Sequence, residues 1–349
     1  MLTPRSRFSF VVAQHAARYL DKAPTLASLS SRGRASCGRG ICFFSLFLSL
    51  LGVSASAQDA TKRPPIIGIA SVSIVSPDFK GMEFYSNQLA LGEGFGMCGG
   101  ASCIVGFGVN AHQAIFVANQ QGFDPLSWKP IDSNLVNVTF ETTDIEGLRN
   151  YLKMRGLLPN DLFTDPTKGN ARAFWLKDPE GHQIGFAQYS GEDKSGYKFR
   201  FKENQVSKRL IHAGFFVQDR AAEDHFFRDI LGFRPYWHGG MKDDETNWVS
   251  IQVPDGTDWL EYMLYEPTGK DKHFKGVMNH IALGVTDIQA AKAQLIKNGW
   301  KPGEEPKIGR DGKWQLNVYD PDETRIEFME FTPKEKPCCS EFTGPHPKP

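Results

Sequence analysis

Residues 280–300 read HIALGVTDIQAAKAQLIKNGW, and an earlier stretch, residues 137–157, reads NVTFETTDIEGLRNYLKMRGL. Each begins with the alternation typical of a strand, continues with Thr-Asp-Ile before an amphipathic segment, and ends in a glycine and one apolar residue. In the later stretch Ile281, Leu283 and Val285 share one strand face, and His280 lies on the other face with small residues. The pattern predicts a strand and a capped helix, used twice.

Two further copies of this pattern begin at Ile69 and His212, so that equivalent positions are separated by 68, 75 and 68 residues. The longer middle interval divides the copies into two pairs, 66–189 and 206–332. Between them, residues 190–205 are polar, charged and contain glycine, as an interdomain linker does. Each copy continues into three more strand-like runs, which predicts a β-α-β-β-β unit repeated four times.

The bulk composition indicates a globular chain that acts on a small molecule. The 349 residues are 40% hydrophobic and 23% charged, and 40 basic residues balance 40 acidic ones. No net field would attract nucleic acid or an anionic membrane. We therefore expect a small-molecule partner and no nucleic acid; the oligomeric state stays open.

The first 57 residues are typical of an export signal. Arginines precede an apolar run of 13 residues, ICFFSLFLSLLGV over 41–53, which is followed by Ala55-Ser56-Ala57. Such a run is too short to span a bilayer, and small residues favour cleavage between Ala57 and Gln58. We expect a periplasmic or secreted protein with no membrane association after cleavage; an uncleaved interfacial anchor is the alternative.

Four cysteines follow the predicted signal. In an oxidising compartment Cys98 and Cys103 could close a short disulfide loop, and the sequence leaves this open. Cys338 and Cys339 lie in a segment rich in proline and lysine. Its composition predicts a disordered tail over 333–349.

The four β-α-β-β-β units resemble the vicinal oxygen chelate superfamily, which includes glyoxalase I, methylmalonyl-CoA epimerase, bleomycin resistance proteins and extradiol dioxygenases. The resemblance extends over residues 66–332. It implies an α+β fold of two paired-module, glyoxalase-like domains, in which each pair forms a cup-shaped mixed sheet with helices outside. In that family the cup encloses a metal ion.

The carboxy-terminal pair carries a matching set of metal-ligand types. His212 and His280 begin equivalent first strands, and Glu261 and Glu327 lie on equivalent last strands, 49 and 47 residues further on. Two imidazoles and two carboxylates suit a divalent Zn, Ni, Fe, Mn or Co ion. Each residue alone is more often structural; their common register favours a shared metal site.

The amino-terminal pair lacks these residue types. Its equivalent positions fall on Ile69, Asn137 and Gly185, with Ala114 or Ile115 near the fourth. We therefore predict that this half folds like the other but binds no metal.

Three functions remain open at this stage. In the glyoxalase and epimerase branch, Glu327 or Glu261 would remove a proton next to a metal-bound carbonyl. The resemblance to type I extradiol dioxygenases implies iron held by His212, His280 and Glu327, but Asn317 stands where that group has a tyrosine, and no histidine occurs over 308–310. A metal-free binding or resistance protein is the third. Further candidates for substrate contact are Trp237, His238, Arg310 and Trp314.

Overall fold

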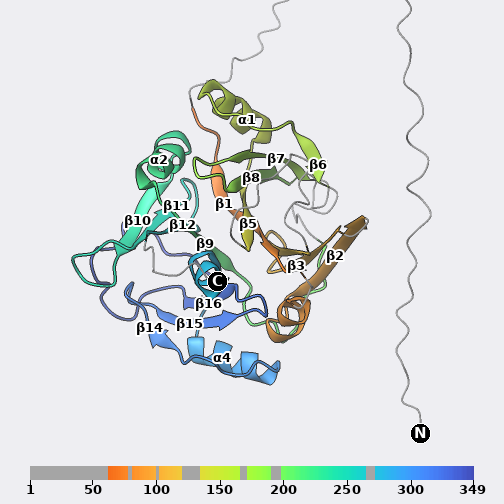
Figure 1. Ribbon diagram of the computed structural model, residues 1–349, viewed down its shortest axis with the longest axis vertical. Helices are drawn as coiled ribbons and strands as arrows, with labels where there is room; N and C mark the ends of the chain where they lie inside the picture. Colours follow the sequence, from red (N-terminus) through yellow and green to blue (C-terminus); the bar gives the residue numbers. More distant parts are fainter. Residues whose placement is uncertain are drawn as a thin grey trace, which may run out of the picture. The chain divides into compact units, whose positions relative to one another are not determined.

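The computed structural model describes residues 62–77, 81–99, 102–119, 134–165, 171–189, 198–264 and 272–349. They form two mixed sheets of eight strands with few helices (Figure 1). The predicted signal, 1–57, and much of the predicted linker lie outside the described residues. Within the described chain, no helix has both the length and the apolar character needed to cross a bilayer.

The first sheet has the order β2-β3-β4-β1-β5-β8-β7-β6. Its strands are β1 (Ile66–Val75), β2 (Gly92–Gly99), β3 (Ser102–Gly108), β4 (Ala114–Ala118), β5 (Leu135–Thr142), β6 (Phe163–Asp165), β7 (Ala171–Lys177) and β8 (Gln183–Gln188). Its helical segments are the π-type turn η1 (Phe84–Gln88) and α1 (Ile145–Met154).

The second sheet has the order β10-β11-β12-β9-β13-β16-β15-β14. Its strands are β9 (Leu210–Phe216), β10 (Arg234–Gly239), β11 (Trp248–Gln252), β12 (Trp259–Met263), β13 (His280–Val285), β14 (Lys307–Ile308), β15 (Trp314–Tyr319) and β16 (Arg325–Glu330). Its helices are α2 (Arg220–Asp224), which continues into the π-type η3 (His225–Ile230), then α3 (Lys272–Met278) and α4 (Ile288–Lys297).

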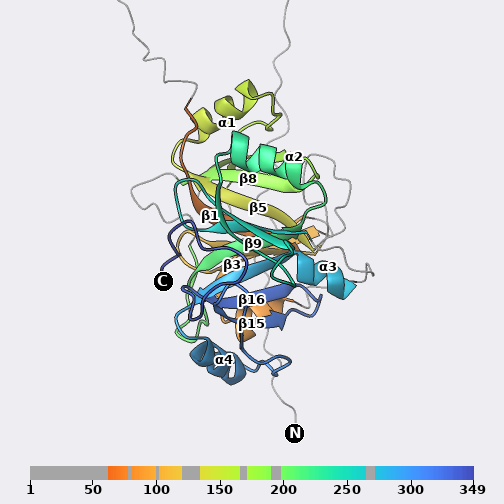
Figure 2. The ribbon, with the colours of Figure 1, turned by 90° about the vertical axis from the view of Figure 1, so that its left-hand side faces the viewer.

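Both sheets follow one plan, because adding eight to each strand number of the first gives the order of the second. In each sheet the first strands of two modules pair antiparallel at the centre, β1 with β5 and β9 with β13. Figures 1 and 2 show α1, α2 and α4 at the periphery of the sheets. The predicted four-module architecture in two paired domains is confirmed.

The helices after the first strands of the second and fourth modules, α1 after β5 and α4 after β13, begin where the sequence predicted. Asp144 accepts a hydrogen bond from the backbone nitrogen of Gly147, and Asp287 accepts from Gln289 and Ala290. These side chains satisfy amides that the first helical turn leaves without a partner.

The core of the second sheet lies on the helix side. Ile281, Leu283 and Val285 are at most 5% exposed and belong to this core, as their alternation predicted. The same cluster of buried side chains includes residues of both halves, and the hydroxyl of Tyr151 donates to the carbonyl of Ile230 across the halves at 2.8 Å. The opposite face of the sheet is therefore free to carry a site.

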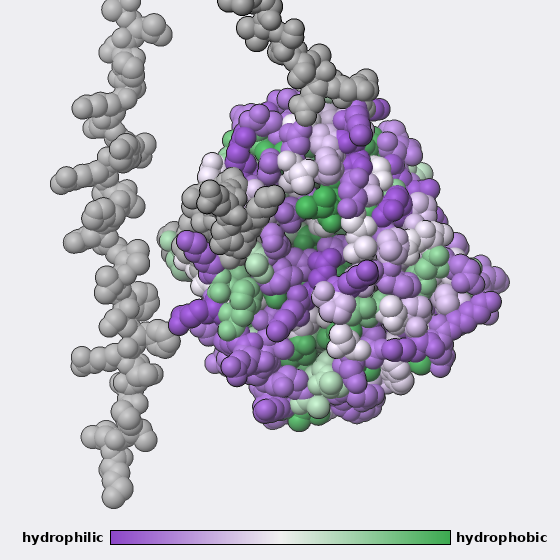
Figure 3. Space-filling model, turned by 180° about the vertical axis from the view of Figure 1, so that it is seen from behind, coloured by the Kyte–Doolittle hydropathy of each residue, from purple (hydrophilic) through white to green (hydrophobic). Residues whose placement is uncertain are grey.

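The face of the molecule in Figure 3 is largely hydrophilic, with small and separate apolar areas. The large apolar side chains that are exposed come from distant parts of the chain: Met154, Leu158, Phe201, Met241 and Ile296. Scattered residues of this kind are normal on a globular protein.

The carboxy-terminal segment differs from the prediction, because residues 333–349 are ordered against the edge strand β10. The backbone nitrogen of Thr343 donates to the carbonyl of Tyr236 at 3.0 Å, and the nitrogen of His238 donates to Ser340 Oγ at 2.9 Å. The rings of Tyr236 and Phe342 lie 4.9 Å apart. Composition suggested disorder, but the unpaired backbone groups of an edge strand and an aromatic contact fix the segment.

Both cysteine pairs of the predicted mature chain are disulfide-bonded. Cys98 and Cys103 face each other across β2 and β3 and form the bond that the sequence had left open. Cys338 and Cys339, neighbours in the sequence, form the second.

Candidate metal centre

The four predicted ligands lie on four adjacent strands in the middle of the second sheet. Glu261 is on β12, His212 on β9, His280 on β13 and Glu327 on β16. The register places Glu261 and His280 on either side of Gly214, and Ala282 between His212 and Glu327. All four side chains therefore project from the same face of the sheet.

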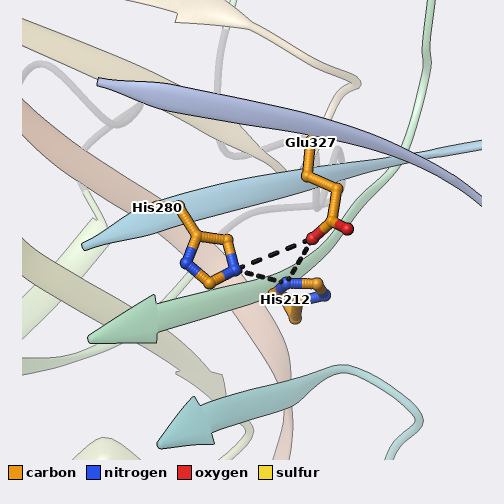
Figure 4. A group of neighbouring side chains, drawn as sticks. All are labelled: His212, His280 and Glu327. Atoms are coloured by element: carbon orange, nitrogen blue, oxygen red, sulfur yellow. Dashed lines mark hydrogen bonds and ion pairs between the residues drawn. The ribbon is translucent and has the colours of Figure 1, made fainter. Parts of the chain in front are cut away.

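The donor atoms of three of these residues converge (Figure 4). Nε2 of His212 lies 3.0 Å from Nε2 of His280 and 3.4 Å from Oε2 of Glu327. The distance from His280 Nε2 to Glu327 Oε2 is 3.7 Å. Both imidazoles are fully buried and Glu327 is 4% exposed.

Glu261 joins this group through His280, whose Nε2 lies 3.3 Å from Glu261 Oε2. Two carboxylates from two modules thus approach one imidazole. The structure brings His212, His280 and Glu327 to one point and places Glu261 beside them, in contact with His280.

Gly214 makes this convergence possible, because the His280 ring lies directly over it. A Cβ at position 214 would lie 2.1 Å from Cε1 of His280 and 2.8 Å from its Nε2. A side chain of any size there would displace the imidazole.

The surroundings of His280 keep its Nε2 available as a ligand. Its Nδ1 lies 3.3 Å from the carbonyl oxygen of Met278, an acceptor only, so Nδ1 carries the proton. Burial lowers the pKa of His280 well below its usual range, and the charge of Arg325 lowers it further. A neutral imidazole with a free Nε2 lone pair is the form that binds a metal.

Glu327 is held as a carboxylate. Burial alone would raise the pKa of Glu327, but the hydrogen bond from His212 and the positive charge of Arg325 outweigh it, and the net shift is downward. An ionised carboxylate is thus present where the two imidazoles meet.

The donor set fits a divalent cation. Two ligand atoms about 2.1 Å from an ion, with bonds at 90° to 110°, lie roughly 3.0 to 3.4 Å apart, close to the distances between these side chains. Nε2 of His212 faces both Nε2 of His280 and the Glu327 carboxylate, and Nδ1 of His212 has no hydrogen-bond partner among the described residues, so no protein group fixes the tautomer with Nε2 free or protonated. The mixture of nitrogen and oxygen donors suits Zn, Ni, Fe, Mn or Co.

A cavity of about 310 Å³ opens onto this group. Glu261 and Glu327 line it, together with Trp237 and Arg310, two of the four residues predicted for substrate contact. The other two predictions are wrong. His238 lies on the exposed side of β10, and Trp314 packs against the core on the opposite face of β15.

Sequence reasoning missed Lys313, a buried lysine in the cavity wall. Lys313, Gln315 and Asn317 line the cavity, while Leu316 and Val318 point into the core. This polar and apolar alternation is visible in the sequence and could have revealed the cavity face. Tyr236 and Phe342, also in the wall, depend on the position of the carboxy-terminal segment and could not have been found that way.

In the first sheet, strand register identifies the equivalent positions as Ser71, Phe116, Asn137 and Gly185. Asn137 and Gly185 agree with the sequence alignment. The position expected at Ile69 is instead that of Ser71, and the position expected at Ala114 or Ile115 is that of Phe116. An irregularity in the pairing of β1 with β5 falls between Ile69 and Ser71 and turns Ile69 into the core. None of these four side chains is a usual metal ligand; that this half binds no metal stays a prediction.

Known proteins share this architecture. A homoprotocatechuate 2,3-dioxygenase variant from Brevibacterium fuscum is 17% identical over 81% of this chain and 74% of that chain, with a TM-score of 0.56. The same enzyme from Arthrobacter globiformis is 17% identical over 77% and 81%, with a TM-score of 0.53. A catechol 2,3-dioxygenase is 13% identical over 82% and 96%, with a TM-score of 0.55. At this identity the likeness establishes the fold alone.

Among curated proteins nothing matches the chain. The family model described as Glyoxalase/Bleomycin resistance protein/Dioxygenase superfamily matches residues 209–328, which contain all four predicted ligands. Residues 209–328 of this chain therefore belong to the glyoxalase, bleomycin resistance protein and dioxygenase superfamily.

Proposed function

We propose that the chain is a divalent-metal-dependent enzyme that moves a proton next to a substrate carbonyl, as glyoxalases and epimerases of the superfamily do. The observation that carries this proposal is the approach of two carboxylates to one imidazole: Glu261 at 3.3 Å and Glu327 at 3.7 Å from His280 Nε2. Two carboxylates repel each other unless a cation lies between them. One of the two can then act as a base.

Each residue has a separate role in this proposal. His212, His280 and Glu327 hold the ion, and their burial fixes its position. A bound divalent ion would polarise the substrate carbonyl as a Lewis acid. Glu261, on the side of the group with the least burial, accepts the proton from the carbon next to the carbonyl and returns it to the neighbouring atom.

The apolar part of the cavity wall supports this chemistry. Trp237, Trp259 and Met329 supply apolar wall, which excludes water from a carbanion-like intermediate. Arg325 lines the same cavity and adds a positive charge that favours developing negative charge on oxygen.

A second candidate is a ring-cleaving dioxygenase. His212, His280 and Glu327 form a compact group of two imidazoles and one carboxylate, with all donor atoms within 4.8 Å, which is the donor set of non-haem Fe(II) oxygenases. The similar structures are dioxygenases that act on dihydroxyaromatic compounds. Asn317 lines the cavity where the dioxygenase pattern would place a tyrosine, and residues 308–310, which also line it, include no histidine.

Glu261 separates the two functions. The full chain, loaded in turn with Zn, Ni, Mn, Co or anaerobic Fe(II), would be tested for deuterium uptake next to the carbonyl of methylglyoxal–thiol adducts and of 2-hydroxy ketones. Proton transfer by Glu261 predicts that Glu261→Gln keeps the ion but loses roughly 10²- to 10⁴-fold in exchange rate. If the Fe(II) protein instead consumes oxygen with catechols, and Glu261→Gln does so equally well, the dioxygenase function is the correct one.

The localisation is a separate proposal. The sequence over 1–57 supports export and cleavage after Ala57. Mass spectrometry of the amino terminus after expression in the native host would test it, and retention of residues before Arg39 in the exported protein would contradict it.

A further inference from the structure

Lys313 immediately precedes β15, and its side chain is fully buried in the wall of the cavity that contains the candidate metal centre. Its ammonium lies among three aromatic rings, 4.6 Å from the ring centroid of Trp259, 4.9 Å from Phe342 and 5.4 Å from Tyr236. These contacts hold the ammonium within the cavity wall.

The ammonium has weak polar partners. Its hydrogen bond to the hydroxyl oxygen of Tyr236 is long, at 3.5 Å. No ion pair within 4.0 Å joins Lys313 to a carboxylate of the described residues. Burying a cation is costly, and the cation–π contacts and the more distant charges of Asp311, Glu327 and Glu261 offset only part of that cost. A lysine in such a place indicates a further anionic partner that the chain itself does not supply.

The polar neighbours of Lys313 are arranged around a cation. Oη of Tyr236 lies 2.6 Å from Nδ1 of His346, so the hydroxyl donates to His346 and turns a lone pair toward Lys313. Burial, and then the charge of Lys313, lower the pKa of His346 and keep its ring neutral as the acceptor. Burial lowers the pKa of Lys313 to about 8, so most of it is protonated at pH 7.

The charges lining the inner cavity favour an anionic ligand. The two negative charges of Glu261 and Glu327 would balance a divalent ion. Of the other charged side chains there, Lys313 and Arg325 are positive and Asp311 is negative, which leaves one net positive charge. Arg310 at the rim is paired with Asp243.

We propose that Lys313 binds an oxyanion of the substrate, such as a carboxylate, that is remote from the oxygens placed at the metal. The substrate is then a small organic acid with a separate chelating group, such as a carbonyl beside a hydroxyl. This proposal rests on the proposed function only in placing the substrate at the metal. Lys313 supplies charge selectivity, and Tyr236, Trp259 and Phe342 hold it in place.

The probes for this site are succinate and glutarate monohydroxamates, compared with their methyl esters. The hydroxamate provides the chelating group in all four compounds, and only the acids carry the remote carboxylate. Binding to the metal-loaded full chain would be measured by calorimetry. A charge-assisted contact predicts that at least one acid binds roughly tenfold or more tightly than its ester.

Substitutions at position 313 test whether Lys313 causes the tighter binding of the acids. In Lys313→Met the acid should fall to the affinity of the ester, while the affinity of the ester stays within about twofold. Lys313→Arg should recover part of the preference, which a merely structural role would not do. Lys307→Met removes an exposed lysine of the same cavity and should leave the preference intact.

Equal binding of acids and esters by the wild-type protein would overturn the proposal, as would a preference that survives in Lys313→Met, or failure of all four compounds to bind. The metal centre is tested separately, by the metal content of the protein and by loss of ester binding on metal removal. The two proposals can therefore fail independently.

Discussion

The two halves of this chain have the same strand order and corresponding register, yet they present different side chains at corresponding points. Where the second half has His212, Glu261, His280 and Glu327, the first has Ser71, Phe116, Asn137 and Gly185. In the first half, Asn137 accepts a hydrogen bond from Thr139, and a Cβ on Gly185 would meet the side chains of Thr139 and Trp175. The module pair therefore provides a geometry, and the residues at four positions decide whether it can hold an ion.

The largest effect on metal binding should come from removing a metal ligand of the second half, with the matched residue of the first half as control. His280→Ala should lower metal affinity by about 100-fold or more, because loss of outer partners alone costs roughly 10- to 100-fold. The matched change in the first half, Asn137→Ala, should leave metal content unchanged. Metal analysis after dialysis against a weak chelator measures both, with circular dichroism as the control for folding. Equal metal loss in the two variants would show that the halves are not functionally distinct.

Filling the space beneath the imidazole should have the next largest effect. Gly214→Ala places a Cβ 2.1 Å from the present position of His280 Cε1, so the ring must move. We expect a loss of roughly 10- to 100-fold in metal affinity, as for other disturbances of ligand orientation. The corresponding residue of the first half is Ser73, and Ser73→Ala should change neither metal content nor the affinity. Unchanged affinity in Gly214→Ala would mean that the ring does not lie over Gly214 in solution.

A smaller effect, on acid binding, should follow from removing an aromatic ring that packs on the second half, compared with one that packs on the first. Phe342 contacts Lys313 in the second half, and Phe199 lies against Gly94 and Gly108 in the first. Phe342→Ala should weaken acid binding several-fold and leave metal content unchanged, because it removes one of three rings that hold the ammonium. Phe199→Ala should lower the melting temperature only. A loss of acid affinity in both variants would contradict a local role for Phe342.

A last effect, on stability and not on metal or acid binding, concerns the contact between the halves, where the turn after β7 meets α2. Burial, and then the charge of Asp178, raise the pKa of Glu223 to about 9. The folded state therefore takes up a proton, and this contribution to stability is full below about pH 4.5 and is lost as pH rises toward 9. Glu223→Gln should be more stable than wild type at pH 8 by on the order of 2 kcal/mol and equal to it near pH 4. Urea unfolding at both pH values measures this, and parallel pH profiles would contradict it.

The sequence predicted the parts of this structure that depend on periodicity. The repeat of strand, capped helix and strands placed His212, Glu261, His280 and Glu327 in one register. The structure brings His212, His280 and Glu327 together and places Glu261 next to His280. The same spacing assigned Ile69 where the register has Ser71, since an irregularity in strand pairing cannot be recognised from spacing. Lys313 and Phe342 were missed because their meeting depends on how the carboxy-terminal segment docks on β10, which local pattern does not determine.

The second half should hold one divalent ion and the first half none. Anomalous diffraction from crystals of the full chain grown with Mn²⁺ examines both halves at once. We expect a single strong peak within about 2.0 to 2.3 Å of His212 Nε2, His280 Nε2 and Glu327, with Glu261 beside it. Absence of a peak there at full Mn²⁺ occupancy elsewhere, or an equal peak beside Ser71, Asn137 and Gly185, would contradict it.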